Sequence, residues 1–392
     1  MNRHLLLLSL CQGLFLTNNV TFIAINGLVG LALAPYGWMA TLPVMGYVVG
    51  GALSAPLVAR LQRLHGRKRC FQMGLLVAMF SCALCAYAIS TKQFWLLVAA
   101  TVIAGFYNAN AGLYRFAGPE LVAPEHKEKA ISLVLAGGIL GAFAGPNLAS
   151  ATREWLAVPF AGAYLALIGV AALALVAVSL IGFAPHQAPA PGASSGRPMG
   201  VIARQPAFIV AVMGGAIGYG VMNLLMAATP IAMQQCKHPF DSAALVLEWH
   251  VLGMFVPSFF TGHLIKRFGA VAVMSAGALL NIACVLVALS GVDLMQFLVA
   301  LLVLGVGWNF LFTGATTLLT STYAPEEKNK AQGAMDTVVF ATMAGTSFAS
   351  GALVTTQGWT WLNLGSLLPI GLVCGALVWL ALTQRRQRAG AA

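Results

Sequence analysis

Two pairs of residues, each with a spacing of four, carry the side chains best suited to metal chemistry in this sequence. Met222 and Met226 form one pair, and His250 and Met254 form the other. Residues four apart in a helix project from the same face, so each pair would present two donor atoms side by side. Thioether sulfurs with one imidazole suit a soft ion, above all Cu(I), whereas hard cations prefer oxygen ligands and zinc sites seldom use methionine. The spacing therefore indicates a candidate copper site.

The turn between the two pairs would place them at matching depth. It is centred near residue 238, so Met226 and His250 each lie 12 positions from it, and Met222 and Met254 each lie 16. These separations correspond to about 18 and about 24 Å along two antiparallel helices. We expect three sulfurs and one imidazole to lie level with one another near the middle of the membrane.

Methionine also fills irregular space between helices, so a packing role for these residues is the alternative. Random placement of 15 Met and 7 His in 392 residues predicts about 0.6 MxxxM pairs and about 0.3 HxxxM pairs. The sequence contains one pair of each kind, and the two pairs fall on consecutive expected helices. A buried histidine in lipid also needs a hydrogen-bonding or ligating reason. The counterparts of the four positions in the first half of the chain, at a shift of 202, are all apolar: Val20, Ala24, Val48 and Ala52. These observations favour ligation over packing.

The composition shows which class of protein must position these residues. Of the 392 residues, 59% are hydrophobic and only 8% are charged, whereas a soluble domain carries about 25% charged residues. The apolar runs lack the alternation of a membrane β-barrel, and about 20 apolar residues span a bilayer as a helix. The sequence thus predicts an all-α membrane protein and excludes a water-soluble enzyme. The twelve expected spans are 4–33, 38–62, 69–90, 93–118, 128–151, 156–183, 205–235, 240–264, 270–290, 294–322, 330–355 and 359–383.

The distribution of charge sets the expected orientation in the membrane. The net charge is +11, which in a soluble protein would suggest a nucleic-acid partner. Here 17 of the 21 basic residues fall on the cytoplasmic side if the N-terminus is inside. Only Lys92, Arg153 and Lys237 fall on the opposite side, with Arg115 near a helix end. The positive-inside rule then places both termini in the cytoplasm, and the lipid bilayer, not nucleic acid, is the expected partner of the basic residues.

The chain divides into two similar halves. The segment 123–130 recurs as 324–331, and a proline-rich stretch, 184–204, separates six spans from six. We predict an N-terminal six-helix bundle over 1–183, a flexible cytoplasmic linker over 184–204, and a C-terminal six-helix bundle over 205–392 that carries the metal site. This duplication resembles the major facilitator superfamily, which implies two pseudo-symmetric halves that rock about a central substrate.

The paired motifs in the seventh and eighth spans resemble those of CcoA-like copper importers. The resemblance implies import of copper across the bacterial inner membrane, supplying the assembly of cbb3-type cytochrome c oxidase, with the two Met and the His-Met pair as copper ligands. Related transporters on the same scaffold are associated with riboflavin and lack the paired motifs. The alternatives are therefore a carrier of a small organic solute, such as riboflavin or a drug, and a membrane copper donor that does not transport. Further segments that carry the resemblance are Tyr114–Ala117, Gly137–Gly138, His250–Gly262 and Gly307–Phe310.

Three residues near the turn could pass copper inward from the outer mouth of the transporter. Met233 lies eleven positions after Met222, near the same helix face, and Cys236 and His238 follow in the turn. The alternative is a packed methionine beside ordinary turn residues.

Two acidic residues fall inside expected spans, where a charge is costly and often functional. Glu248 and Asp336 could couple proton movement to transport, or could lie near the outer and inner interfaces respectively. Arg115 and Glu120 are expected to pair at the cytoplasmic end of the fourth span. The sequence shows no catalytic constellation and no nucleotide-binding motif, so we expect neither an enzyme nor a prosthetic group, and copper enters only as the transported substrate.

Overall fold

The computed structural model describes residues 3–123, 127–183, 196–324 and 327–389, and the regular elements in those ranges are all helical. The elements are α1 (Arg3–Leu33), η1 (Gly37–Met39), α2 (Leu42–Ser90), α3 (Phe94–Ala111), α4 (Tyr114–Ala117), η2 (Gly118–Leu121), α5 (Lys127–Ala136), α6 (Gly138–Thr152), α7 (Ala161–Ser179), α8 (Met199–Ile202), α9 (Pro206–Gln235), α10 (Phe240–Phe255), α11 (Ser258–Phe268), α12 (Ala270–Leu289), α13 (Leu294–Thr320), α14 (Lys328–Thr356) and α15 (Gly358–Ala389).

The prediction of an all-helical membrane protein is confirmed. Eleven helical segments of the described ranges are long and apolar enough to cross a membrane, and the bent pair α10–α11 brings the number to twelve if it forms one span. The long helix α2 holds two spans that meet near Gly66. The backbone of Gly66 has a φ of 76°, which glycine adopts at little cost because it has no Cβ.

The expected continuous span over 240–264 is instead broken. The helix α10 ends at Phe255, α11 begins at Ser258, and their axes differ by 41°. Pro257 lies between them, and proline removes a backbone donor and clashes with the preceding turn of a helix. The helix α10 ends one residue after Met254, so the break bears directly on the candidate site.

Close contacts divide the chain into two compact units. Unit 1 comprises Met1–Pro189, Ala227–Glu248 and Ser347–Thr356, and unit 2 comprises Ala190–Met226, Trp249–Thr346 and Gln357–Ala392. The helices α9, α10 and α14 therefore each contribute to both units. The division into 1–183, 184–204 and 205–392 stays a prediction, and residues 184–195 of the expected linker lie outside the described residues.

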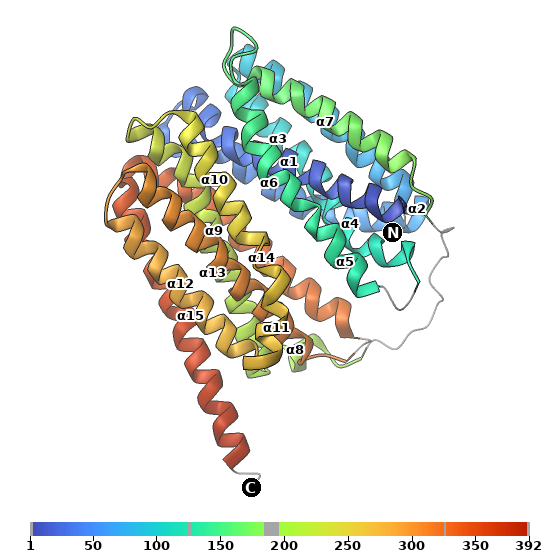
Figure 1. Cartoon of the computed structure of the whole chain (residues 1–392), viewed down its shortest axis with the longest axis vertical. Coiled ribbons are helices and arrows are strands. Elements are labelled where there is room, and N and C mark those ends of the chain that lie inside the picture. Colours follow the sequence, from blue (N-terminus) through green and yellow to red (C-terminus); the bar gives the residue numbers. More distant parts are fainter. Residues whose placement is uncertain (1–2, 124–126, 184–195, 325–326, 390–392) are drawn as a thin grey trace. The chain divides into compact units, whose positions relative to one another are not determined.

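In unit 1, α1 packs along α6 and α7, and α2 packs along α3 and α7 (Figure 1). Small residues allow the closest approach. Gly50 of α2 lies against the backbone of α3 at Val102, and Gly105 of α3 lies against the backbone of α2, so neither position has room for a Cβ. Close packing of small residues is the usual way in which membrane helices associate, because lipid supplies no hydrophobic driving force between them.

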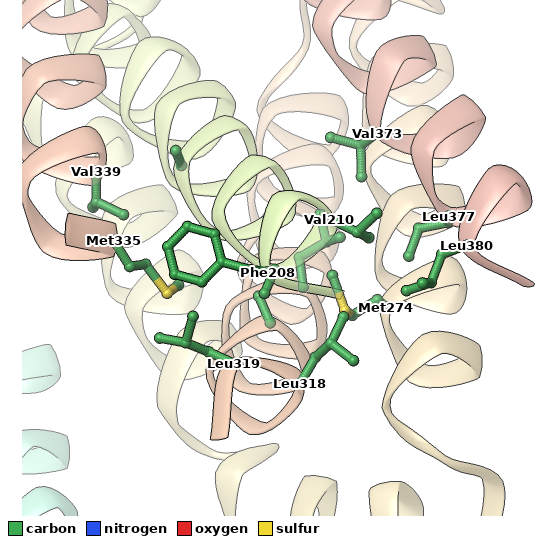
Figure 2. Packing of buried hydrophobic residues seen from close by; sticks show 14 of the residues in the cluster. Phe208, Val210, Met274, Leu318, Leu319, Met335, Val339, Val373, Leu377 and Leu380 are labelled. Carbon is green, nitrogen blue, oxygen red and sulfur yellow. The ribbon is translucent and has the colours of Figure 1, made fainter. Parts of the chain in front are cut away.

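In unit 2, the first turns of α9 lie in an apolar cluster that joins α9 to α12, α13, α14 and α15. Figure 2 shows the Phe208 ring of α9 beside the Met335 side chain of α14, with Leu318 and Leu319 of α13 below it. Two glycines of α9 also allow close approach, here to side chains, because Gly214 lies against Met274 and Gly218 lies against Leu311. This packing fixes the helix that carries Met222 and Met226.

Candidate functional site

The four proposed copper ligands are all buried and all belong to unit 2. The exposed fractions are 1% for Met222, 6% for Met226, 0% for His250 and 7% for Met254. Met226 lies nine residues before the end of α9, and His250 lies ten residues after the start of α10. The helix bounds are therefore compatible with the matching depth expected from the sequence. Burial removes these side chains from lipid and from bulk water.

The His250 ring is held in one orientation by α13. Its Nδ1 atom lies 2.7 Å from the carbonyl oxygen of Leu301. A carbonyl can only accept, so Nδ1 carries the proton and the neutral ring keeps an unprotonated Nε2. Among the residues that the structure describes, Nε2 has no hydrogen-bond partner, although the side chain is fully buried. Metal-binding histidines usually donate their other ring N–H to a backbone carbonyl or carboxylate in this way.

The same helix also fixes Met254. The Asn309 Nδ2 atom of α13 donates to the Met254 carbonyl oxygen at 2.7 Å and to Ser258 Oγ at 2.6 Å. Asn309 Oδ1 accepts a hydrogen bond from Thr261 Oγ1 at 2.7 Å. Asn309 therefore satisfies a backbone carbonyl at the break between α10 and α11, where a regular helical partner is lost.

An aromatic group on α13 contacts both helices that carry the sulfurs. The Trp308 ring lies 5.2 Å from the Tyr219 ring of α9 and 6.4 Å from the Phe255 ring of α10, measured between centroids. It also stacks on Phe312 at 5.3 Å. Tyr219 precedes Met222 by three residues and Phe255 follows Met254, so α9 and α10 both pack on α13 next to the candidate ligands. Trp308 Nε1 is a buried donor with no partner in the described part of the chain.

The sequence analysis placed Asn309 only within the segment Gly307–Phe310 and did not name Leu301, although both residues position the proposed ligands. An asparagine in an expected span is itself a signal, since a polar side chain buried in a membrane protein must find partners. The Leu301 carbonyl could not be found from the sequence, because His250 contacts it across 51 residues of chain.

The three residues proposed as a relay lie in unit 1. Met233 is fully buried in α9, whereas Cys236 and His238 are half-buried in the turn that follows. The His238 backbone N–H donates to the Met233 carbonyl at 2.9 Å, which closes the end of the helix. Burial raises the pKa of the Cys236 thiol, which disfavours the thiolate that would bind a metal. A role in passing copper stays a prediction.

Glu248 and Asp336 lie within α10 and α14, as expected. Glu248 is half-buried and accepts a hydrogen bond from Asn147 Nδ2 at 2.9 Å, while Asp336 is exposed. These positions leave proton coupling as a prediction for both residues.

The expected pairing of Arg115 with Glu120 is wrong. Glu120 instead pairs with Arg67, which donates from Nε at 2.7 Å and from Nη2 at 2.5 Å. Two parallel donors of one guanidinium match both carboxylate oxygens. Arg67 follows directly after Gly66, the residue with non-helical backbone angles inside α2. Arg115 lies over the Phe116 ring, 4.7 Å from its centroid.

Within the described ranges, no group of three or more His, Cys, Asp or Glu side chains is placed to hold a metal ion. Of the four residues in the paired motifs only His250 is of these types, so this finding does not support copper as a substrate. A set of three thioethers and one neutral imidazole suits soft ions of low charge.

Comparison with known proteins defines the family. The family model of the Major Facilitator Superfamily matches residues 5–247 and 212–392. The riboflavin transporter RfnT of Brucella anthropi is 38% identical over 364 residues, which cover 92% of this chain and 91% of the relative. The uncharacterized MFS-type transporter YddS of Bacillus subtilis is 27% identical over 87% of this chain and 82% of its own. The name of the first relative agrees with the alternative of a small-solute carrier better than with copper import.

Solved structures agree with this fold. The nucleoside transporter NupG superposes with a TM-score of 0.76 at 12% identity, covering 96% of this chain and 99% of its own. The human organic anion transporter MFSD10 (TETRAN) superposes with a TM-score of 0.68 at 16% identity, covering 95% and 99%. The chain is a multi-pass membrane transporter and not an enzyme, because the helices, the family model and the named relatives all describe a carrier. It belongs to the Major Facilitator Superfamily.

Proposed function

We propose that this transporter imports copper across the bacterial inner membrane and thereby supplies assembly of cbb3-type cytochrome c oxidase, with both termini in the cytoplasm. The observation that carries the proposal is the His250 imidazole, which is fully buried, oriented through Nδ1 by the Leu301 carbonyl, and unpartnered at Nε2. The resemblance of the chain to CcoA-like importers, through the paired motifs, suggests copper as the ion and oxidase assembly as its destination.

The proposed ligands suit a transported ion better than a resident one. Met222, Met226 and Met254 would provide three neutral thioethers, and His250 one neutral nitrogen. Thioethers bind Cu(I) but hold it less tightly than thiolates do, so the ion can leave when the two halves rock. A monovalent ion also brings less charge into a buried site than a divalent one.

A small organic solute is the second candidate, and two observations favour it. The riboflavin transporter of Brucella anthropi is 38% identical over nearly the whole of both chains. Next to the proposed ligands, Trp308 Nε1 is an unpartnered donor, His250 Nε2 is an unpartnered acceptor, and aromatic rings surround the indole. A planar solute with both an acceptor and a donor could use these groups. A membrane copper donor that binds without transport is the third reading.

Uptake of radiocopper and of riboflavin by the same cells separates the three readings. Wild type is compared with His250→Ala and with the double variant Met222→Ala/Met226→Ala. The matched controls are His263→Gln and Met295→Leu, because both side chains are exposed and lie outside the site. Copper import predicts loss of radiocopper uptake in the first two variants only. Equal copper uptake in all five proteins would contradict it, riboflavin uptake alone would support the second reading, and copper binding without accumulation would support the third.

A further inference from the structure

Unit 1 contains a cavity of about 680 Å³ at the end of α9 and the start of α10. Its wall comes from the end of α1, the turn after α2, the segment 153–160 before α7, and the turn between α9 and α10. The proposed copper ligands do not line it. By the charge distribution along the chain, this end is expected to face outward.

The charged side chains that line this cavity, here called the outer cavity, are both basic. Lys92 and Arg153 line it, together with the half-buried imidazole of His238. No Asp or Glu is among its lining residues. Asp241 is next in sequence to the lining residue Phe240, but it accepts a hydrogen bond from Ser150 Oγ. The outer cavity therefore has a positive wall without an acidic partner in it.

Arg153 is oriented with its donors available. Its guanidinium carbon lies 5.5 Å from the centroid of the Phe160 ring and 5.7 Å from that of the Phe240 ring. The N–H groups of a guanidinium lie at its edge, so a guanidinium whose face packs on aromatic rings can still donate hydrogen bonds to an anion. The Nε atom is buried and has no hydrogen-bond partner in the ranges that the structure covers, and Arg153 forms no ion pair there.

The backbone around the outer cavity is strained. Outside glycine, positive φ angles in the described residues occur at Lys92 (55°), Phe160 (69°) and Lys237 (64°). Lys92 and Phe160 line the cavity, and Lys237 precedes the lining residue His238. Bulky residues rarely adopt this conformation, and strain of this kind gathers at ligand-binding sites. The Phe160 N–H donates to the Arg153 carbonyl at 2.8 Å, which holds this strained segment closed.

We propose that the outer cavity binds an organic anion with an apolar body. Its carboxylate or phosphate lies between Lys92 and Arg153, and its apolar part lies along the α1 residues Leu28 and Leu33 and the Phe160 ring. A bidentate contact with the Arg153 edge satisfies the orphaned donor, and the apolar wall excludes small inorganic anions as tight ligands. The proposal does not depend on the identity of the solute that the transporter carries.

Calorimetric titration of the purified full-length protein with cinnamate tests the site, with neutral cinnamamide as the comparison ligand. Arg153→Gln should weaken cinnamate binding at least about tenfold, since it removes a charged donor. Lys92→Gly should weaken it as well while melting no earlier than wild type, because glycine relieves the positive φ. The matched control is Arg115→Gln, which removes another arginine that packs on a phenylalanine but lies outside the cavity.

Nanodiscs of phosphatidylcholine with and without phosphatidylglycerol identify the source of the anion. Weaker cinnamate binding in phosphatidylglycerol would assign the site to a lipid headgroup, and unchanged binding would assign it to a soluble anion. Equal binding of cinnamate and cinnamamide would overturn the proposal. So would unchanged affinity in both cavity variants, or absence of cinnamate binding in both kinds of nanodisc. None of these results bears on copper, because Cu(I) binding is expected to be the same in Arg153→Gln and wild type.

Discussion

His250 Nδ1 and the carbonyl oxygen of Leu301 lie 2.7 Å apart, so α13 fixes the tautomer of a histidine on α10. The ring can present an unprotonated Nε2 only while this contact holds. The two ring nitrogens of His250 therefore have different roles. Nδ1 holds the ring in place, and Nε2 is the atom proposed to bind the ion.

The two roles of His250 can be tested by replacing it with asparagine. The Asn amide N–H can take the place of Nδ1 and donate to Leu301, so His250→Asn should keep most of the stability. His250→Ala should lose about 1–3 kcal/mol, because it leaves a buried carbonyl unsatisfied. Both variants should lose copper uptake. Thermal melting in detergent and radiocopper accumulation measure the two effects, and copper uptake by His250→Asn at the wild-type level would refute a ligand role for Nε2.

Trp308→Phe distinguishes the first two candidate functions. Phenylalanine can keep the ring contacts with Tyr219 and Phe312 but lacks the indole N–H. A solute that accepts a hydrogen bond from Nε1 should lose about tenfold in apparent affinity, whereas copper uptake should change little. Parallel uptake assays with riboflavin and radiocopper check this. A large loss of copper uptake with normal folding would show that the indole serves the ion.

Asn309→Leu should disturb the break between α10 and α11. It removes both donors from Met254 O and Ser258 Oγ and leaves the Met254 carbonyl unsatisfied, at a cost of about 1–3 kcal/mol. We expect a lower melting temperature and weaker Cu(I) binding, because Met254 loses its support. A matched substitution elsewhere on α13, Thr316→Leu, removes only an exposed hydroxyl that bonds within its own helix, and it should leave both properties near wild type.

The contact between Arg197 and Glu327 predicts an acid-sensitive contribution to stability. Hydrogen bonds from the Arg197 side chain, with one from the Ala324 backbone, lower the pKa of Glu327 from 4.5 to about 2. A carboxyl with a lowered pKa stabilises the fold while it is ionised. The contribution is therefore present above pH 4.5 and is lost as the pH falls toward 2.

The test of this contact is the melting temperature as a function of pH. The difference between wild type and Glu327→Gln should be largest at neutral pH and should shrink as the pH falls below 4.5. The effect should be modest, since nearly half of the Arg197 side chain is exposed and solvent screens it. A difference that grows on acidification would contradict the assignment.

The fold was predictable because its signal is local, whereas much of the site was not. Runs of apolar residues specify spans wherever they occur, and the predicted limits agree with α1, α9, α12 and α13 to within a few residues. The break after Phe255 was also marked in the sequence, by Pro257, but the apolar run across it concealed the bend. In contrast, Glu120 pairs with Arg67 across 53 positions, and the nearer Arg115 was the wrong choice. Contacts of that kind depend on which helices become neighbours.

In the candidate site, the ligand motifs could be predicted from the sequence, but the groups that hold them in place could not. Burial of Met222, Met226, His250 and Met254 followed from their place in apolar helices. Neither the Leu301 carbonyl nor the positive φ angles of Lys92 and Phe160 have a sequence signal. A backbone carbonyl is present at every residue, and left-handed lysine or phenylalanine goes against the usual preference.

X-ray absorption at the copper edge, on purified protein loaded with Cu(I), probes the proposed ligands themselves. We expect one bound ion with sulfur scatterers and a single imidazole nitrogen, and loss of the nitrogen contribution in His250→Asn. No bound copper in wild type, or the same spectrum in wild type and His250→Asn, would contradict a copper site at these residues.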